Sequence, residues 1–329
     1  MTVETLPAFD ASEFSLAKKL LSARVASMFG RKMEEGDWDF VYCNSKRIPK
    51  KDWSNLHIDI NYNGLGVEHK MLRIAKLGSI LEECGTTKMH PAGTRSIRIP
   101  DQKDPNLAAE DVLSQYCELI DSRTRKVQAL SPNNTADMRI GWLLWKESLD
   151  EFLYFEQRMK KPVVNDYWAK WNITSAKGSR KESCSLWIYE KATGQKRYSI
   201  TTVAGAKIQP YFDVPPPTDE NLYYFRVQGF LLQSGLVEVW LTKSTASWLE
   251  RLYGSLDSTT LSDAILKNTP QSIKNELQTE FIQAEEIAVP IKISEQAYNR
   301  LKEIFDPISD EYLLQQFAIE SGEAHKKTV

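Results

Sequence analysis

The most regular alternation of hydrophobic and polar positions lies in residues 56–62, which read LHIDINY. A period of two predicts a strand that buries one of its faces. Asn63-Gly64 follows, which is a strong signal for a two-residue hairpin turn, and the extended pattern resumes over residues 67–72. We therefore predict a β-hairpin over residues 56–73.

Apolar residues recur at the spacing of a helix face in several other segments. We predict helices over residues 13–33, 109–130 and 149–159. Ser12 is a suitable N-cap for the first of these helices, and Gly36 lies just beyond its end. From residue 247 onward the pattern is mostly helical, and residues 321–329 are expected to form a frayed tail.

Short runs of β-branched, aromatic and other apolar residues predict the remaining strands. These strands cover residues 38–42, 185–189, 197–203, 222–232 and 237–241, and residues 140–145 form a further short apolar run. The strands over residues 185–189 and 197–203 flank the turn sequence ATGQ and form a second predicted hairpin. Helices before, between and after hairpin-rich segments indicate a mixed α/β (α+β) fold.

Length and composition allow two domains or one large domain. The chain has 329 residues, of which 42% are hydrophobic and 26% charged, so it can bury a substantial core. The triple proline at residues 215–217 has no flexible linker around it, and we interpret it as a connector within one domain. We expect a main domain over residues 1–255 and a helical C-terminal segment over residues 256–329 that packs on it.

Charge, cysteines and motifs exclude several classes of protein. The 42 basic and 44 acidic residues give a formal net charge of −2, so a strongly basic coat for nucleic acid is absent. The four cysteines lack the spacing of zinc ligands and favour reduced thiols, and neither a signal peptide nor a bilayer-spanning segment is evident. We expect a cytoplasmic protein with no membrane partner. P-loop and dinucleotide motifs are absent, which argues against a nucleotide cofactor.

The first predicted hairpin brings together residues that could carry chemistry. Glu68 and Lys70 are two positions apart on a strand and share a face, while His69 points to the other face. The partner strand would bring Asp59 alongside them. Adjacent carboxylates repel, so the pair needs a cation such as Mg²⁺, which prefers oxygen ligands. The alternative is a solvated strand face on which Glu68 and Lys70 form an ordinary ion pair.

Asp59 followed by Glu68-His69-Lys70 resembles the motif of the PD-(D/E)XK nuclease superfamily. The resemblance implies a restriction-endonuclease-like central mixed sheet flanked by helices, with residues 1–255 as the nuclease domain and its DNA-recognition insertions. It implies Mg²⁺ held by Asp59, Glu68 and the backbone carbonyl of His69, with Lys70 assisting the attacking water. A chain of this length without helicase motifs looks most like a type II restriction endonuclease. Such an enzyme cleaves double-stranded DNA, as a homodimer where its site is a palindrome.

The identity of the first acidic ligand stays open in the sequence. The residue before Asp59 is isoleucine and not the proline that names the motif. Asp37 or Asp39 could take the place of Asp59, and Glu13 or Glu34 could contribute from the first predicted helix.

Basic residues are candidates for contacts with DNA phosphates and base edges. They are Lys46, Arg47, Lys50, Lys51, Arg95, Arg98, Arg180 and Lys181. Trp168 and Trp171, beside Lys170, could stack on bases, although core packing is the commoner role of tryptophan. A non-catalytic nucleic-acid-binding protein on a similar scaffold is the main alternative function, and an enzyme acting on a small substrate is a third.

Overall fold

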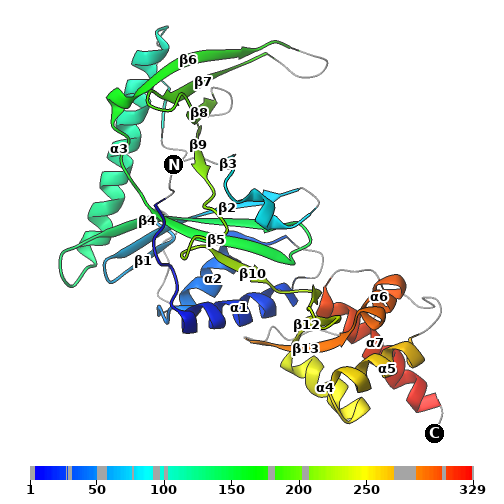
Figure 1. Cartoon of the computed structure of the whole chain (residues 1–329). Coiled ribbons are helices and arrows are strands. Elements are labelled where there is room, and N and C mark those ends of the chain that lie inside the picture. The colour runs from blue at the N-terminus through cyan, green and yellow to red at the C-terminus, as the bar shows by residue number, and fades with distance from the viewer. Residues whose placement is uncertain are drawn as a thin grey trace.

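The computed structural model describes residues 4–26, 28, 32–49, 58–75, 78–91, 97–99, 103–176, 182–201, 207–269, 287–305 and 309–327. These residues form seven α-helices and three β-sheets, so the predicted mixed α/β (α+β) fold is confirmed (Figure 1). Among the described helices, none combines the length and the apolar character needed to cross a membrane.

The central sheet has five strands in the order β1-β2-β4-β5-β10. Its strands are β1 (Ile60–Tyr62), β2 (Leu65–Ile74), β4 (Asp137–Lys146), β5 (Glu151–Arg158) and β10 (Tyr223–Arg226). β2 and β4 are parallel and the other pairs are antiparallel, so the sheet is mixed. The parallel pair needs a crossover connection, and α3 (Pro105–Ala129) forms its helical part.

Helices cover both faces of this sheet. On one face, α1 (Ala11–Ala26) and α2 (Glu35–Ser45) share a buried cluster with Val67 and Tyr154. On the other face, α3 comes close to β2 at Gly66, where an added Cβ would lie 2.3 Å from the side chain of Val127. Helices thus lie on both faces of β2 in the first hairpin. The other strand of this hairpin, β1, is an edge strand of the sheet.

The second sheet is antiparallel and has the order β3-β9-β8-β7-β6. Its strands are β3 (Thr87–Met89), β6 (Tyr167–Thr174), β7 (Ser183–Glu190), β8 (Lys196–Thr201) and β9 (Lys207–Asp213). Short 3-10 helices, η1 (Ile80–Glu83) and η2 (Val164–Asp166), precede β3 and β6. The long helix α3 runs beside both sheets and packs against β6 and β7 (Figure 1).

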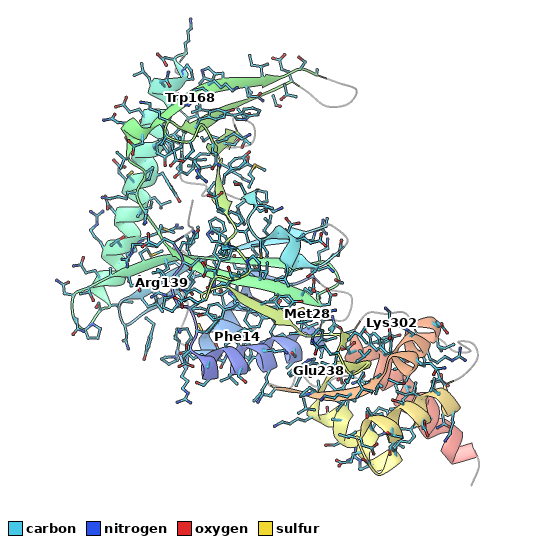
Figure 2. The ribbon with its side chains drawn as sticks, viewed as in Figure 1. Phe14, Met28, Arg139, Trp168, Glu238 and Lys302 are labelled. Atoms are coloured by element: carbon cyan, nitrogen blue, oxygen red, sulfur yellow. The ribbon has the colours of Figure 1, made fainter. Side chains whose placement is uncertain are left out.

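The C-terminal unit combines a small sheet with four helices. Its elements are β11 (Phe230–Leu231), β12 (Leu236–Thr242), α4 (Lys243–Tyr253), α5 (Ser258–Asn268), β13 (Ala288–Ser294), α6 (Glu295–Ile304) and α7 (Asp310–Lys327). The apolar core of this unit includes Val237 and Leu249, which precede residue 256 in the sequence. Lys18 of α1 pairs with Glu238 of β12 at 3.8 Å. Figure 2 labels Glu238, which lies where the C-terminal unit meets α1.

Both predicted hairpins are confirmed, as β1–β2 and β7–β8, and the helix expected over residues 109–130 is α3. The ends of the other helices differ from prediction. α1 ends at Ala26, and its N-cap is Asp10, whose Oδ1 accepts a hydrogen bond from the Glu13 N–H at 2.8 Å. α7 continues to Lys327, through most of the predicted tail, and β13 was not predicted.

Two predicted elements were wrong, and tertiary packing explains both. The expected strand over residues 38–42 lies within α2, whose buried Trp38, Val41 and Tyr42 have helical spacing. The expected helix over residues 149–159 contains β5, which buries side chains on both faces and therefore shows no alternation.

Candidate functional site

The β1–β2 hairpin brings Asp59 alongside Glu68, as the sequence predicts. Asn63 and Gly64 adopt φ angles of 48° and 86°, the left-handed conformation that a tight hairpin turn requires. The register pairs Ile60 with Val67, so Asp59, the residue just before β1, lies next to Glu68. The backbone N–H of His69 donates a hydrogen bond to Asp59 Oδ2 at 2.7 Å, which ties this acid to β2.

Glu68 is buried and has two basic partners. Its Oε1 accepts hydrogen bonds from Lys70 Nζ at 2.7 Å and from Arg123 Nη2 at 2.9 Å. Burial of an unpaired carboxylate is energetically costly, and the positive charges of Lys70 and Arg123 offset this cost for Glu68. Sequence reasoning missed Arg123, because it comes from α3 and no local pattern links it to the hairpin.

Asp59 lies in an environment that disfavours its charge. Burial and, next, the neighbouring Glu68 carboxylate raise the pKa of Asp59 to about 7. Partial desolvation likewise raises the pKa of Glu35, at the start of α2, where Lys70 opposes the shift and Asp39 and Glu68 add to it. Asp59 and Glu35 thus both lie in surroundings that disfavour a charged carboxylate.

The raised pKa of Asp59 predicts a pH-dependent stability in metal-free buffer. A carboxyl whose folded-state pKa lies above its unfolded value of 3.8 lowers stability once the pH rises through that interval toward 7. Asp59→Asn is therefore expected to stabilise the fold at pH 8, by roughly 2–4 kcal/mol, and to change little at pH 4. Urea unfolding at both pH values, in EDTA, measures the difference. A variant that is less stable than the wild type at pH 8 would contradict the assignment.

The imidazole of His69 lies on the opposite face of β2 and is fully buried. Its Nδ1 is 2.6 Å from Asp39 Oδ1, and its Nε2 is 3.1 Å from the Tyr154 hydroxyl. Gly141 makes room for this contact, since a Cβ there would lie 2.4 Å from Tyr154 Oη and 2.8 Å from His69 Cδ2. His69 can therefore reach the Asp59–Glu68 face through its backbone and not through its ring.

The structure separates the three candidates for the first acidic ligand. Asp59 shares a face with Glu68. Asp39 is bonded to His69 on the other face, and Asp37 Oδ2 accepts the Glu34 N–H at 3.0 Å in the capping box of α2. Asp37 and Asp39 therefore have structural partners, and the geometry favours Asp59.

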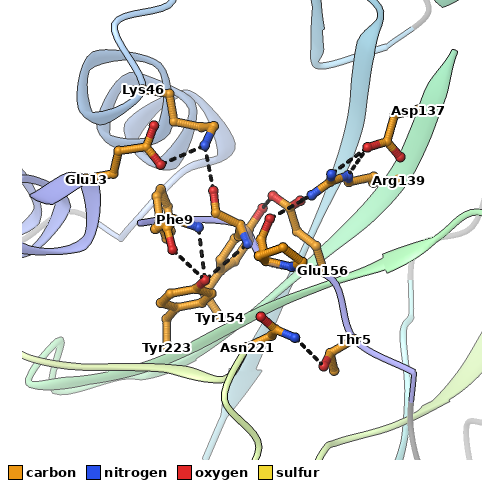
Figure 3. A network of polar contacts seen from close by, with 12 residues as sticks. Thr5, Phe9, Glu13, Lys46, Asp137, Arg139, Tyr154, Glu156, Asn221 and Tyr223 are labelled. Carbon is orange, nitrogen blue, oxygen red and sulfur yellow. Dashed lines mark hydrogen bonds and ion pairs between the residues drawn. The ribbon is translucent and has the colours of Figure 1, made fainter. Parts of the chain in front are cut away.

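Buried contacts continue from Tyr154 toward the N-terminal segment (Figure 3). The Tyr154 hydroxyl donates to Glu156 Oε1 at 2.8 Å, and Arg139 Nη1 donates to Glu156 Oε2 at 2.9 Å. Arg139 also donates to Asp137 at 2.8 Å and to the carbonyl of Pro7 at 2.9 Å. These contacts connect β4, β5 and the N-terminal segment to the imidazole of His69 through Tyr154.

Lys46 and Glu13, two of the functional candidates from the sequence, form an ion pair with each other. Lys46 Nζ donates to the carbonyl of Ala8 at 2.6 Å and to Glu13 Oε2 at 2.9 Å (Figure 3). Their geometry indicates a link between α1, α2 and the N-terminal segment. A phosphate contact by Lys46 would require this link to break.

Two of the other residues predicted to contact DNA lie within the described part of the chain. Arg47 and Arg98 are exposed, as a phosphate contact requires. The remaining candidates lie outside the described residues; they are Lys50, Lys51, Arg95, Arg180 and Lys181. Of the tryptophans, Trp171 packs against the core, where its Nε1 donates to the carbonyl of Lys103 at 2.9 Å, while Trp168 is exposed on the other face of β6.

No protein-family model, curated protein or solved structure matches the chain, so the chemistry of this face has to be argued from its own geometry. Within the described residues, no group of three or more Asp, Glu, His or Cys side chains is arranged to hold a metal ion. The candidate site thus consists of two carboxylates, Asp59 and Glu68, with Lys70 and Arg123, near the edge of the central sheet.

Proposed function

We propose that the protein is a Mg²⁺-dependent endonuclease of the type II restriction kind, which hydrolyses phosphodiester bonds of double-stranded DNA. The observation that carries this proposal is the convergence of Asp59, Glu68 and Lys70 on one face of the edge hairpin of a mixed sheet. A homodimer would suit a palindromic site. The four free cysteines favour a reducing compartment such as the cytoplasm.

The donor atoms suit Mg²⁺. Asp59, Glu68 and the carbonyl of His69 would supply oxygen ligands, and Mg²⁺ is commonly held by one or two carboxylates together with waters and substrate phosphate. A complete cage of protein side chains is therefore unnecessary. A cation would also relieve the carboxylate repulsion that contributes to the raised pKa of Asp59. When bound, Mg²⁺ would polarise the scissile phosphate and promote ionisation of a water molecule.

Lys70 and Arg123 would act on the phosphodiester. Both are held by Oε1 of Glu68, so their positive charges are already positioned before substrate binds. Preorganised charges stabilise the negative charge that develops on a phosphate in the transition state. Lys70 would orient the attacking water or the phosphate, and Arg123 would contact a phosphate oxygen.

Cleavage assays with and without metal test the proposal. Mixed plasmid and phage DNA are expected to give discrete bands with Mg²⁺ and none with EDTA. Glu68→Gln keeps the shape of the side chain but removes its charge, and we expect at least about 100-fold slower cleavage. Glu303→Gln is the matched control, because Glu303 is 67% exposed on α6. Cleavage in EDTA, or full cleavage by Glu68→Gln, would contradict the proposal.

One observation favours the non-catalytic alternative. Glu68 already has two basic partners, so its charge is compensated without a metal. In a nucleic-acid-binding protein, Asp59 and Glu68 would then be structural. Mg²⁺-independent binding of duplex DNA, with no cleavage of several methylated and unmethylated DNAs, would support this alternative.

A further inference from the structure

The second sheet leaves one face without a covering element among the described residues. Ala169, Leu186 and Ile200 point toward α3 and form the core on its other face. The open face is lined by aromatic and lysine side chains from four adjacent strands. This aromatic–lysine face consists of Trp168, Lys170, Trp187, Tyr189, Lys196 and Tyr211.

The rings and ammonium groups of the aromatic–lysine face form a continuous stripe across the strands. Trp168 stacks on Tyr189 with ring centroids 4.5 Å apart and an angle of 12° between the planes. Lys170 Nζ lies 5.3 Å from the Tyr189 centroid and 5.7 Å from that of Trp187. Lys196 Nζ continues the stripe, 3.8 Å from the Trp187 centroid. Each cation thus lies against a ring, which keeps both in one geometry.

The charge of this face is uncompensated. Within the described residues, neither Lys170 nor Lys196 forms an ion pair. Strands β6 to β9 contain two carboxylates, Glu190 and Asp213, and both pair with Arg197. The lysines therefore remain available for an anionic partner.

Exposure of a large ring adds a second argument. Trp168 is 38% exposed although it belongs to a strand, and its stacking on Tyr189 holds its plane fixed. A fixed, solvent-facing ring offers a surface on which a flat ligand can stack at little entropic cost. Among anionic ligands, an unpaired nucleic acid strand combines flat bases with regularly spaced phosphates.

We propose that the aromatic–lysine face binds single-stranded nucleic acid, with bases stacked on Trp168 and phosphates at Lys170 and Lys196. Stacking platforms bordered by cations are the general means of holding single strands, because every base has a flat face. A duplex keeps its base faces inside the stack, so this face would prefer a strand that is already open. The partner class is shared with the proposed function, but binding here does not depend on hydrolysis.

Binding of a fluorescein-labelled 20-nucleotide oligo(dT), compared with a duplex of the same length, tests this proposal in EDTA. The wild type is expected to prefer the single strand. Trp168→Ala is expected to weaken binding by about 5- to 150-fold, and Trp168→Phe to restore much of it. The double variant Lys170→Ala with Lys196→Ala is expected to reduce the slope of log K against log salt concentration by about 1.4.

Lys302→Ala is the matched control, since Lys302 lies 5.5 Å from the Tyr298 ring in the C-terminal unit, far from the second sheet (Figure 2). Near-UV circular dichroism verifies that each variant is folded. Unchanged affinity in the Trp168 and lysine variants would overturn the proposal. Competition by an anionic polysaccharide, with no effect of Trp168→Ala, would also overturn it and would indicate a purely electrostatic site. Because EDTA prevents metal-dependent cleavage, a failure of the nuclease proposal leaves this measurement unaffected.

Discussion

Replacing Lys70 by methionine is expected to slow DNA cleavage by about 100- to 1,000-fold while DNA binding is retained. The Lys70 ammonium lies 2.7 Å from Glu68 Oε1, on the face that Asp59 shares. Methionine has a similar length but no charge, so the loss falls on transition-state stabilisation. Arg123 remains bonded to Glu68 in the variant, so the buried carboxylate keeps one cation and the fold is expected to survive.

Single-turnover cleavage rates with Mg²⁺, together with the Kd for the same DNA in EDTA, separate catalysis from binding. Lys160→Met is the matched control, because Lys160 also pairs with a carboxylate, Glu4, but is 63% exposed away from the hairpin. The control should cleave at the wild-type rate. Full cleavage by Lys70→Met would remove Lys70 from the mechanism.

The parts of the site that could be predicted are those encoded by local signals. Period-two alternation and the Asn63-Gly64 turn specify both the hairpin and its register. The register alone then places Asp59 next to Glu68 and turns His69 to the other face. For this reason, the sequence is sufficient to predict that Asp59, Glu68 and Lys70 lie close together, although Asp59 precedes β1 and the other two residues belong to β2.

The parts that could not be predicted depend on partners far apart in the chain. His69 meets Asp39 and Tyr154 across sequence separations of 30 and 85 residues. Tyr154 lies on β5, which is buried on both faces and therefore lacks the alternation of a strand. Asp39 lies in α2, where the strand-favouring residues Trp38, Phe40, Val41 and Tyr42 surround it. Lys46 looked like a surface cation, because the acid that binds it, Glu13, comes from another helix.

Replacing Arg139 by methionine is expected to lower the free energy of unfolding by about 3–5 kcal/mol. Glu156 is fully buried in β5, and Arg139 Nη1 lies 2.9 Å from its Oε2. Removing one partner of a buried pair leaves the other charge uncompensated in a medium of low dielectric constant. The destabilisation should extend to the face of β2 that carries His69. Glu156 also accepts a hydrogen bond from the Tyr154 hydroxyl, which contacts His69.

Urea unfolding at neutral pH measures this effect, and Arg73→Met is its matched control. Arg73 Nη1 lies 2.8 Å from Glu147, but the two side chains are 42% and 63% exposed, so a loss below about 1 kcal/mol is expected there. Adding Glu156→Gln to Arg139→Met should recover much of the stability, because the uncompensated charge is then gone. Equal losses in the two arginine variants would mean that burial of Glu156 does not strengthen its dependence on Arg139.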